Sequence, residues 1–310
     1  TTLRNFITWS KTNAAADNYA LVMWNHGGGL SGVNFDDESG NDSITIGDLR
    51  SAIMQAGVPL QVLAYDACLM GMAEQAYEAR GLAAIQVASE EVIDGPGYNY
   101  KTAFQALNTN PASVTAQQLA QGMVSSFTTS YVSDGVSTLS AVSSAAMDSV
   151  ATTLRTFVTA SAGLTAANIT TIKSIVGGVT HFDFPENIDL KQFMQRVSTT
   201  ASLPAAVRSR PSMWVTLTLR RSPSPRSPPT APGSFMSASS PMSSPTGATP
   251  ICGSSTSTAP ALSRLPMGTA IIRAASRGWR FRRTRNISLT PIRASICRPS
   301  MSCAVSPMGR

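Results

Sequence analysis

Cysteine and histidine are scarce in this 310-residue chain, which contains four Cys and two His. Cys68 is the only cysteine before residue 209. Residues 1–208 therefore cannot contain an internal disulfide framework or a multi-cysteine zinc site. No apolar run approaches the roughly 20 residues that span a membrane. Few cysteine and histidine side chains in this part of the chain are therefore available to act as a nucleophile or to transfer a proton.

Acidic residues are absent from the last third of the chain. Residues 209–310 contain 14 Arg and no Asp or Glu, which gives +14. Residues 1–208 contain 10 Lys and Arg against 17 Asp and Glu, which gives 10 − 17 = −7. The last third also lacks Lys, His, Gln and Tyr, and it carries 14 of the 19 prolines. The overall charge of +7 therefore belongs to a basic, low-complexity tail.

Three explanations fit this change of composition. A shift of reading frame near Ser209 in GC-rich DNA would produce Arg, Pro, Ser and Ala without Lys or Tyr. A disordered basic arm would bind nucleic acid or an acidic surface, because Trp279 to Arg285 (WRFRRTR) interleaves aromatic and arginine side chains. A folded second domain is the third explanation. The frameshift is preferred, so we predict one functional domain in residues 1–208 and a frameshifted or disordered tail in residues 209–310.

Apolar strand patterns alternate with amphipathic helical patterns in residues 1–208. Strands are predicted over residues 19–24, 60–65, 84–88 and 137–143, and helices over 3–11, 45–56, 69–80, 113–127, 145–160 and 190–197. This alternation predicts an α/β fold with a mostly parallel sheet and helices on both faces.

Two motifs follow neighbouring strands of this predicted sheet. His26 lies in WNHGGG and Cys68 lies in DACLMG. The carboxyl ends of parallel strands form the site crevice, so we expect the two side chains to meet there. His26 would then deprotonate the thiol, because His181 lies in a loop without glycines. The structural alternatives are a buried apolar Cys68 and an ordinary polar His26.

The surroundings of Cys68 refine this hypothesis. The amides of Gly27 and Cys68 are predicted to hold an oxyanion, and the predicted helix after Cys68 would stabilise its thiolate. Asp66 lies two residues before Cys68 on a strand, so both face the same side. Asp66 is therefore predicted to bind a cationic substrate side chain. The alternative role for Asp66 is to cap the helix over residues 69–80.

The motifs resemble the clostripain family of cysteine peptidases, which has a caspase-like fold. The resemblance rests on YALVMWNHGGG (residues 19–29), LAYDACLMGMAEQAYEAR (63–80) and VASEEVIDGPGYNY (87–100), and more loosely on STLSAVSS and NIDLKQF. It implies a caspase-like three-layer sandwich. The family's first strand is expected before Thr1, and its last strands are expected where residues 209–310 stand.

The resemblance also implies an activity and a site. His26 and Cys68 would be the catalytic pair, and Asp66 the acid of the specificity pocket. A second pocket acid is expected among Glu90, Glu91 and Asp94. The family implies a secreted or cell-surface endopeptidase that cleaves peptides and proteins after Arg or Lys. Its chemistry needs no cofactor, although several members need calcium.

Two alternatives to an active peptidase remain open. The chain could be a catalytically inactive scaffold, or it could bind nucleic acid through its basic tail. Binding through the tail would weaken steeply with salt and would be lost on truncation at Arg208, unlike peptidase activity. A fragment without its first and last strands could also be inactive.

Overall fold

The computed structural model describes residues 2–36, 40, 42–131, 137–209, 269–275 and 278–281, the last two ranges by their backbone alone. The helices are α1 (Thr2–Asn13), α2 (Ile46–Ala56), α3 (Ala73–Glu78), α4 (Tyr100–Ala103), α5 (Gln105–Thr109), α6 (Ala116–Ser130), α7 (Met147–Ser161), α8 (Ala166–Gly178), α9 (Leu190–Thr199) and α10 (Ala205–Arg208). The strands are β1 (Asn18–Trp24), β2 (Val33–Asp36), β3 (Asp42–Ile44), β4 (Leu60–Asp66), β5 (Ala83–Ala88), β6 (Ser140–Ser143), β7 (Thr269–Ala275) and β8 (Gly278–Phe281).

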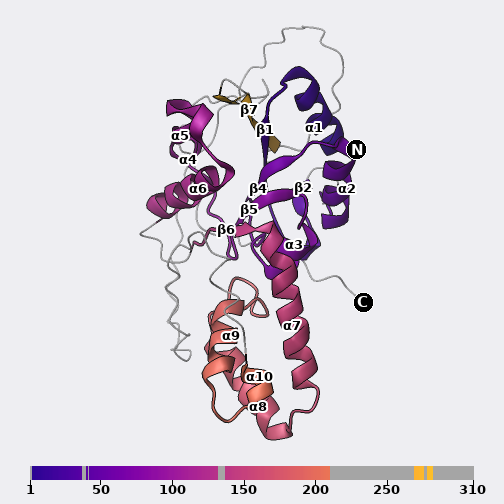
Figure 1. Cartoon of the computed structure of the whole chain (residues 1–310), viewed down its shortest axis with the longest axis vertical. Helices are drawn as coiled ribbons and strands as arrows, with labels where there is room; N and C mark the ends of the chain where they lie inside the picture. Colours follow the sequence, from indigo (N-terminus) through magenta and orange to yellow (C-terminus); the bar gives the residue numbers. More distant parts are fainter. Residues whose placement is uncertain are drawn as a thin grey trace, which may run out of the picture.

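The strands form one main sheet in the order β6-β5-β4-β1-β7-β8 (Figure 1). β1, β4 and β5 are parallel, whereas β6 and β7 run antiparallel to their neighbours β5 and β1. β2 and β3 form a separate two-stranded ribbon. At the carboxyl ends of the central strands, Trp24 of β1 pairs with Asp66 of β4. This register therefore determines which residues of the two following loops lie next to each other.

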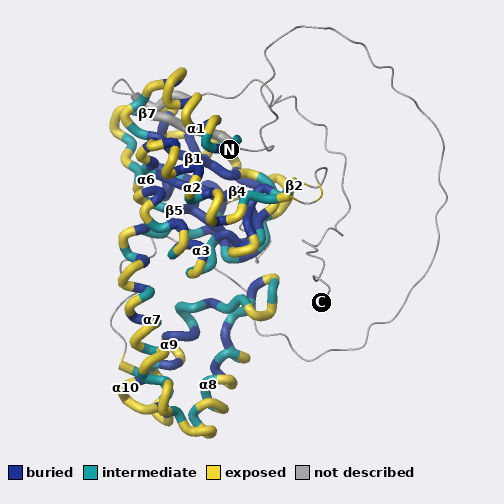
Figure 2. The backbone as a smooth tube through the Cα atoms, turned by 90° about the vertical axis from the view of Figure 1, so that its right-hand side faces the viewer, coloured by how far each residue is buried: buried dark blue, intermediate teal, exposed yellow. Residues whose placement is uncertain are grey.

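Helices cover both faces of the sheet, and buried residues concentrate in its central strands (Figure 2). On one face, Leu21 and Leu63 pack with α1 and α2. On the other face, Val22 and Ala64 pack with α4, α5 and α6. Apolar side chains on both faces of a strand are what a covered parallel sheet requires. The predicted mostly parallel α/β sheet with helices on both faces is therefore confirmed.

The helices α7 to α10 form a lobe below the sheet (Figure 1). Phe157 of α7 and Phe193 of α9 meet edge to face in its core, with ring centroids 5.8 Å apart. Asp189 caps the start of α9, because its Oδ1 accepts hydrogen bonds from the amides of Lys191 and Gln192 at 3.0 and 3.1 Å.

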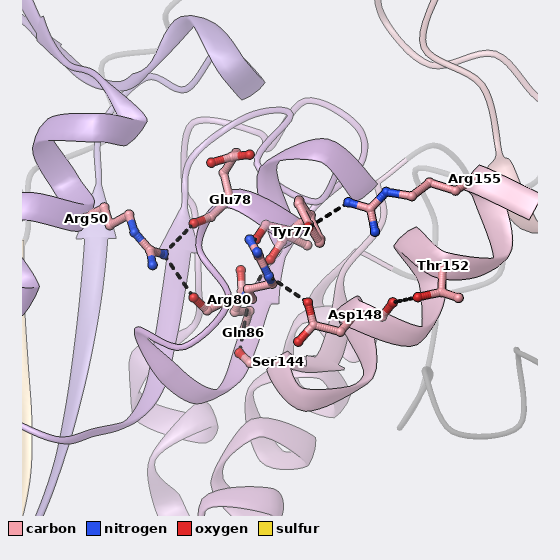
Figure 3. Close-up of polar contacts among 10 residues, drawn as sticks. Arg50, Tyr77, Glu78, Arg80, Gln86, Ser144, Asp148, Thr152 and Arg155 are labelled. Atoms are coloured by element: carbon pink, nitrogen blue, oxygen red, sulfur yellow. Dashed lines mark hydrogen bonds and ion pairs between the residues drawn. The ribbon is translucent and has the colours of Figure 1, made fainter. Parts of the chain in front are cut away.

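Polar contacts attach this lobe to the sheet domain at the end of α3 (Figure 3). Arg80 Nε lies 2.9 Å from Asp148 Oδ1, and Arg155 Nη2 donates to Tyr77 Oη at 3.2 Å. Arg50 Nη1 donates to the carbonyl oxygens of Glu78 and Arg80 at 3.0 and 3.1 Å. These bonds tie α2 and α7 to the same short segment.

The main differences from the sequence prediction lie outside the central strands. The ribbon β2-β3, helix α8 and strands β7 and β8 were not predicted. β7 and β8 lie in the tail, where β7 pairs with β1 and with β8. The assignment of residues 209–310 as a frameshifted or disordered tail stays a prediction. The side chains of the WRFRRTR motif and of the tail cysteines Cys252, Cys297 and Cys303 lie outside the described residues.

A core substitution tests this packing. Leu63 is completely buried in the centre of the sheet, so Leu63→Ala should lower the free energy of unfolding by about 2–5 kcal/mol. Leu30 is 57% exposed, so Leu30→Ala should change it by less than about 0.5 kcal/mol. Urea unfolding of both variants measures the difference. Equal effects would contradict the placement of β4.

Candidate active site

The histidine motif forms a tight hairpin at the end of β1. The amide of Gly28 donates to Gly32 O at 3.0 Å, and the amide of Asn34 donates to His26 O at 2.9 Å. Gly27 and Val33 form an isolated antiparallel bridge between these two bonds. The His26 side chain is exposed. The hairpin therefore holds its backbone while leaving the imidazole accessible.

Cys68 lies in a turn, not at the start of a helix. Leu69 has a φ of 62°, and α3 begins only at Ala73. The amides of Leu69 and Gly71 donate instead to Glu91 O and Ser89 O, at 3.2 and 2.6 Å. These long-range bonds replace the first turn of the predicted helix over residues 69–80. The predicted stabilisation of the thiolate by a helix dipole is therefore wrong.

The two motifs are in direct backbone contact. A Cβ atom built on Gly27 would lie 2.3 Å from Cys68 O, so only glycine permits the observed approach. Since Trp24 pairs with Asp66, His26 and Cys68 both stand two residues beyond the paired strand ends. The structure thus brings the two predicted residues to one edge of the sheet.

The thiol is held by a segment that follows β5. The amide of Ile93 donates to Cys68 Sγ at 3.4 Å, and Sγ lies 3.9 Å from Ile93 O. Cys68 is 7% exposed. The backbone of Ile93 therefore contacts the thiol both as a donor and as an acceptor. Sequence reasoning missed Ile93, because no motif marks a donor that acts through its backbone.

Asp66 is surrounded by Tyr98 and Tyr100, on the sheet face that α4 and α6 cover. Its carboxylate accepts the amide of Tyr98 at 3.1 Å and the hydroxyl of Tyr100 at 2.6 Å. A Cβ atom on Gly97 would lie 2.7 Å from Oδ2. Asp66 is 3% exposed, and this burial raises its pKa although the hydrogen bonds from Tyr100 and Tyr98 oppose the shift.

Asp66 does not cap α3. The residue that precedes this helix is Met72, and the helix has no side-chain cap. All the hydrogen bonds found for Asp66 among the described residues come from neutral groups. The capping alternative is therefore wrong, and a buried carboxylate is left at the edge of the sheet, two residues before Cys68.

The three candidates for a second pocket acid occupy different environments. Glu91 is buried, and its Oε1 accepts the amide of Val92 at 3.1 Å. Glu90 is partly buried, and its amide donates to Thr138 Oγ1 at 3.2 Å. Asp94 is exposed and begins the turn that leads to Gly97. Asp94 is thus the candidate whose carboxylate faces solvent.

Other predicted or possible sites can be placed as well. His181 lies in the helical lobe, where its Nε2 is 3.0 Å from Val176 O and its Nδ1 contacts Pro185 O. Within the described ranges, no group of three or more His, Cys, Asp and Glu side chains could hold a metal ion. The calcium expected from the resemblance therefore remains a prediction. In the same ranges, no helix has the length and apolar character needed to cross a membrane.

Comparison with known proteins identifies the family. Residues 1–208 match the sequence model of the Clostripain family. The chain belongs to this family. It is 32% identical to clostripain of Hathewaya histolytica over an alignment that covers 38% of this chain and 29% of that protein. The chain therefore spans less than a third of the length of this relative.

Two solved structures share the fold of this clostripain-family chain. A secreted C11 cysteine protease from Bacteroides thetaiotaomicron, in complex with an irreversible peptide inhibitor, superposes with a TM-score of 0.56 and 19% identity, covering 71% of this chain and 61% of that one. An inactive zymogen C11 protease from Parabacteroides distasonis gives a TM-score of 0.52 and 22% identity, covering 71% and 60%. These likenesses confirm the predicted fold class.

The close approach of Gly27 can be tested by adding one methyl group. In Gly27→Ala the new Cβ would clash with Cys68 O, so the hairpin must shift and move His26. We expect alkylation of Cys68 by iodoacetamide at neutral pH to slow by about 10- to 100-fold. Gly163→Ala is the control, since a Cβ there meets open space. Equal alkylation rates in both variants would contradict the contact.

The burial of Asp66 predicts a pH effect on stability. Because its pKa is raised, the folded state binds the proton more tightly than the unfolded state. The free energy of unfolding therefore falls as pH rises from about 4, the usual Asp pKa, through the raised pKa. Asp66→Asn removes this loss, so the variant should gain stability relative to wild type across this window.

Urea unfolding between about pH 4 and pH 8 measures the effect of Asp66→Asn. Asp94→Asn is the matched control, because Asp94 is exposed and should not show this relative gain. A wild type whose stability rises relative to Asp66→Asn as the pH increases would show that folding lowers the pKa of Asp66, which would contradict the raised pKa.

Proposed function

We propose that this chain is a cysteine endopeptidase that cleaves peptide bonds after Arg or Lys. The contact of Gly27 with the carbonyl of Cys68 is the observation that carries the proposal, because it unites the imidazole and thiol loops. Membership of the Clostripain family and the fold shared with C11 proteases support the same chemistry.

The proposed reaction begins with proton transfer from Cys68 Sγ to the imidazole of His26. The thiolate attacks the carbonyl carbon of the scissile bond, and the amide of Ile93 stabilises the thiolate beforehand. His26 then returns the proton to the leaving amine. Water, deprotonated by His26, hydrolyses the thioester and releases the second product.

The amides of Gly27 and Cys68 are proposed to bind the oxyanion of the tetrahedral intermediate. The neighbouring Gly28 amide is occupied by Gly32 O, whereas the Gly27 amide donates to no group within the described residues. An unoccupied amide beside the nucleophile is the kind of donor that an oxyanion pocket needs.

Asp66 is proposed to bind the cationic side chain that precedes the scissile bond, with the exposed Asp94 as second acid. The buried carboxylate of Asp66 accepts hydrogen bonds from neutral donors only, within the described residues. The cationic side chain of a substrate would therefore supply the positive charge that this carboxylate lacks. Gly97 and Tyr98 cover Asp66 in the described conformation. Residues 94–97 must therefore move to admit the side chain.

Cleavage of fluorogenic peptide amides tests the proposal. Wild-type protein should release the fluorophore after Arg or Lys, and Cys68→Ala and His26→Ala should each abolish this activity. Asp66→Asn should lower kcat/KM for basic substrates by about 100-fold or more, because it removes the anionic partner. Equal cleavage by wild type and Cys68→Ala would refute the assignment. A basic and a neutral substrate cleaved equally well would refute the specificity.

Localisation and partners follow from the same proposal. The relative from B. thetaiotaomicron is a secreted protease, and we propose that this protein likewise acts on extracellular peptides or proteins with basic residues. Calcium dependence remains part of the proposal. Dialysis against a chelator before the assay would reveal it as a loss of activity that added calcium restores.

A further inference from the structure

Asn34 closes the hairpin that carries His26. Its amide donates to His26 O at 2.9 Å, and its side-chain Nδ2 donates to Trp24 O at 3.2 Å. These two bonds hold the carbonyl groups on either side of Asn25. Asn34 therefore determines the path of the backbone from the end of β1 to His26.

The conformation of Asn34 alone does not explain why an amide side chain stands here. Its φ is 58°, in the left-handed region that glycine adopts without cost and asparagine tolerates. Its side chain is 2% exposed, so it occupies space in the interior. Glycine would satisfy the backbone geometry, but it would lack both polar atoms of the amide.

One of these polar atoms has no partner. Asn34 Oδ1 is buried and accepts no hydrogen bond within the described part of the chain. The amide orientation is set by Trp24 O, because a flipped amide would place two oxygens against each other. A buried acceptor without a donor is costly, so its persistence beside a candidate site indicates a role.

His26 carries the type of donor that this oxygen lacks. Because Gly27 pairs with Val33, His26 lies directly opposite Asn34 in the hairpin. The bond from the Asn34 amide to His26 O, 2.9 Å long, holds the two residues next to each other across the hairpin. An imidazole that turns toward Cys68 can therefore present its other N–H group to Asn34.

We propose that Asn34 is a positioning residue for His26, with Oδ1 accepting the imidazole N–H that does not face the thiol. This role rests on the proposed function, in which His26 takes the proton of Cys68. The imidazolium then carries two N–H groups, one toward sulfur and one bound by Asn34. The bond fixes the ring orientation and decides which nitrogen receives the proton.

The pH dependence of Cys68 alkylation in the full chain tests this role without any substrate. Iodoacetamide labelling is followed by mass spectrometry of the peptide that contains Cys68, because the chain contains three further cysteines, Cys252, Cys297 and Cys303. Asn34→Gly suits the backbone and removes the amide. We expect it to remain folded with a lowered Tm, because the bond to Trp24 O is lost. At a temperature where it is folded, it should react about 10-fold more slowly near pH 6 and show a lower kcat without a higher KM.

Asn34→Asp provides the matched comparison. It keeps an acceptor for the ring N–H and adds a negative charge, so the imidazolium should persist to higher pH and activity should exceed that of Asn34→Gly. The other ionisable groups on adjoining elements are the same in every variant. They are Tyr19 on β1, Tyr65, Asp66 and Cys68 on β4 and its turn, Asp36 and Asp42 on the ribbon, Glu74, Tyr77 and Glu78 on α3, and Glu90, Glu91 and Asp94 after β5. Any shift of the profile therefore reports on position 34.

A folded Asn34→Gly variant with the wild-type alkylation profile would overturn the proposal. If Asn34→Gly does not fold, an unchanged profile in Asn34→Asp would overturn it equally. His26→Ala separates this failure from failure of the proposed function. If the alkylation profile changes in His26→Ala but not in the Asn34 variants, only the role of Asn34 is refuted. If the profile of His26→Ala equals that of the wild type, the catalytic pair itself is refuted.

Discussion

The parallel pairing of β1 with β4 is the constraint on which the site depends. Because Trp24 pairs with Asp66, β1 and β4 end side by side at the same edge of the sheet. His26 and Cys68 each follow two residues after these strand ends. Gly27 then lets the backbones touch, since any side chain would collide with Cys68 O. A shift of one residue in this register would send Asp66 to the opposite face of the sheet.

The segment after β5, residues 89–98, contacts both the turn around Cys68 and the carboxylate of Asp66. Its carbonyls bind the amides of Leu69 and Gly71, its Ile93 amide contacts the thiol, and its Tyr98 amide contacts Asp66. One segment thus holds both the nucleophile and the candidate specificity acid. Burial raises the pKa of that acid and lowers stability, a cost that is typical of residues retained for binding.

The sequence could predict the central strands and the edge at which the site lies, because apolar runs and the glycines that end them are local signals. It could not predict the turn around Cys68. Residues 69–80 have good helix formers, but the amides of Leu69 and Gly71 bind carbonyls about 20 residues away. β7 was missed for the same reason, since its partner β1 lies about 250 residues earlier in the chain. Asn34 was missed because the left-handed turn that brings its amide back to Trp24 O has no motif in the sequence.

Cross-linking of the native protein with 1,3-dibromoacetone tests the central claim most directly, because this reagent can join a neighbouring thiol and imidazole through a three-carbon bridge. Cys68 would displace one bromide and His26 the other. The account predicts a cross-linked pair of peptides containing Cys68 and His26 in the wild type, and none in His26→Ala. A wild-type protein alkylated at Cys68 but never joined to His26 would contradict it.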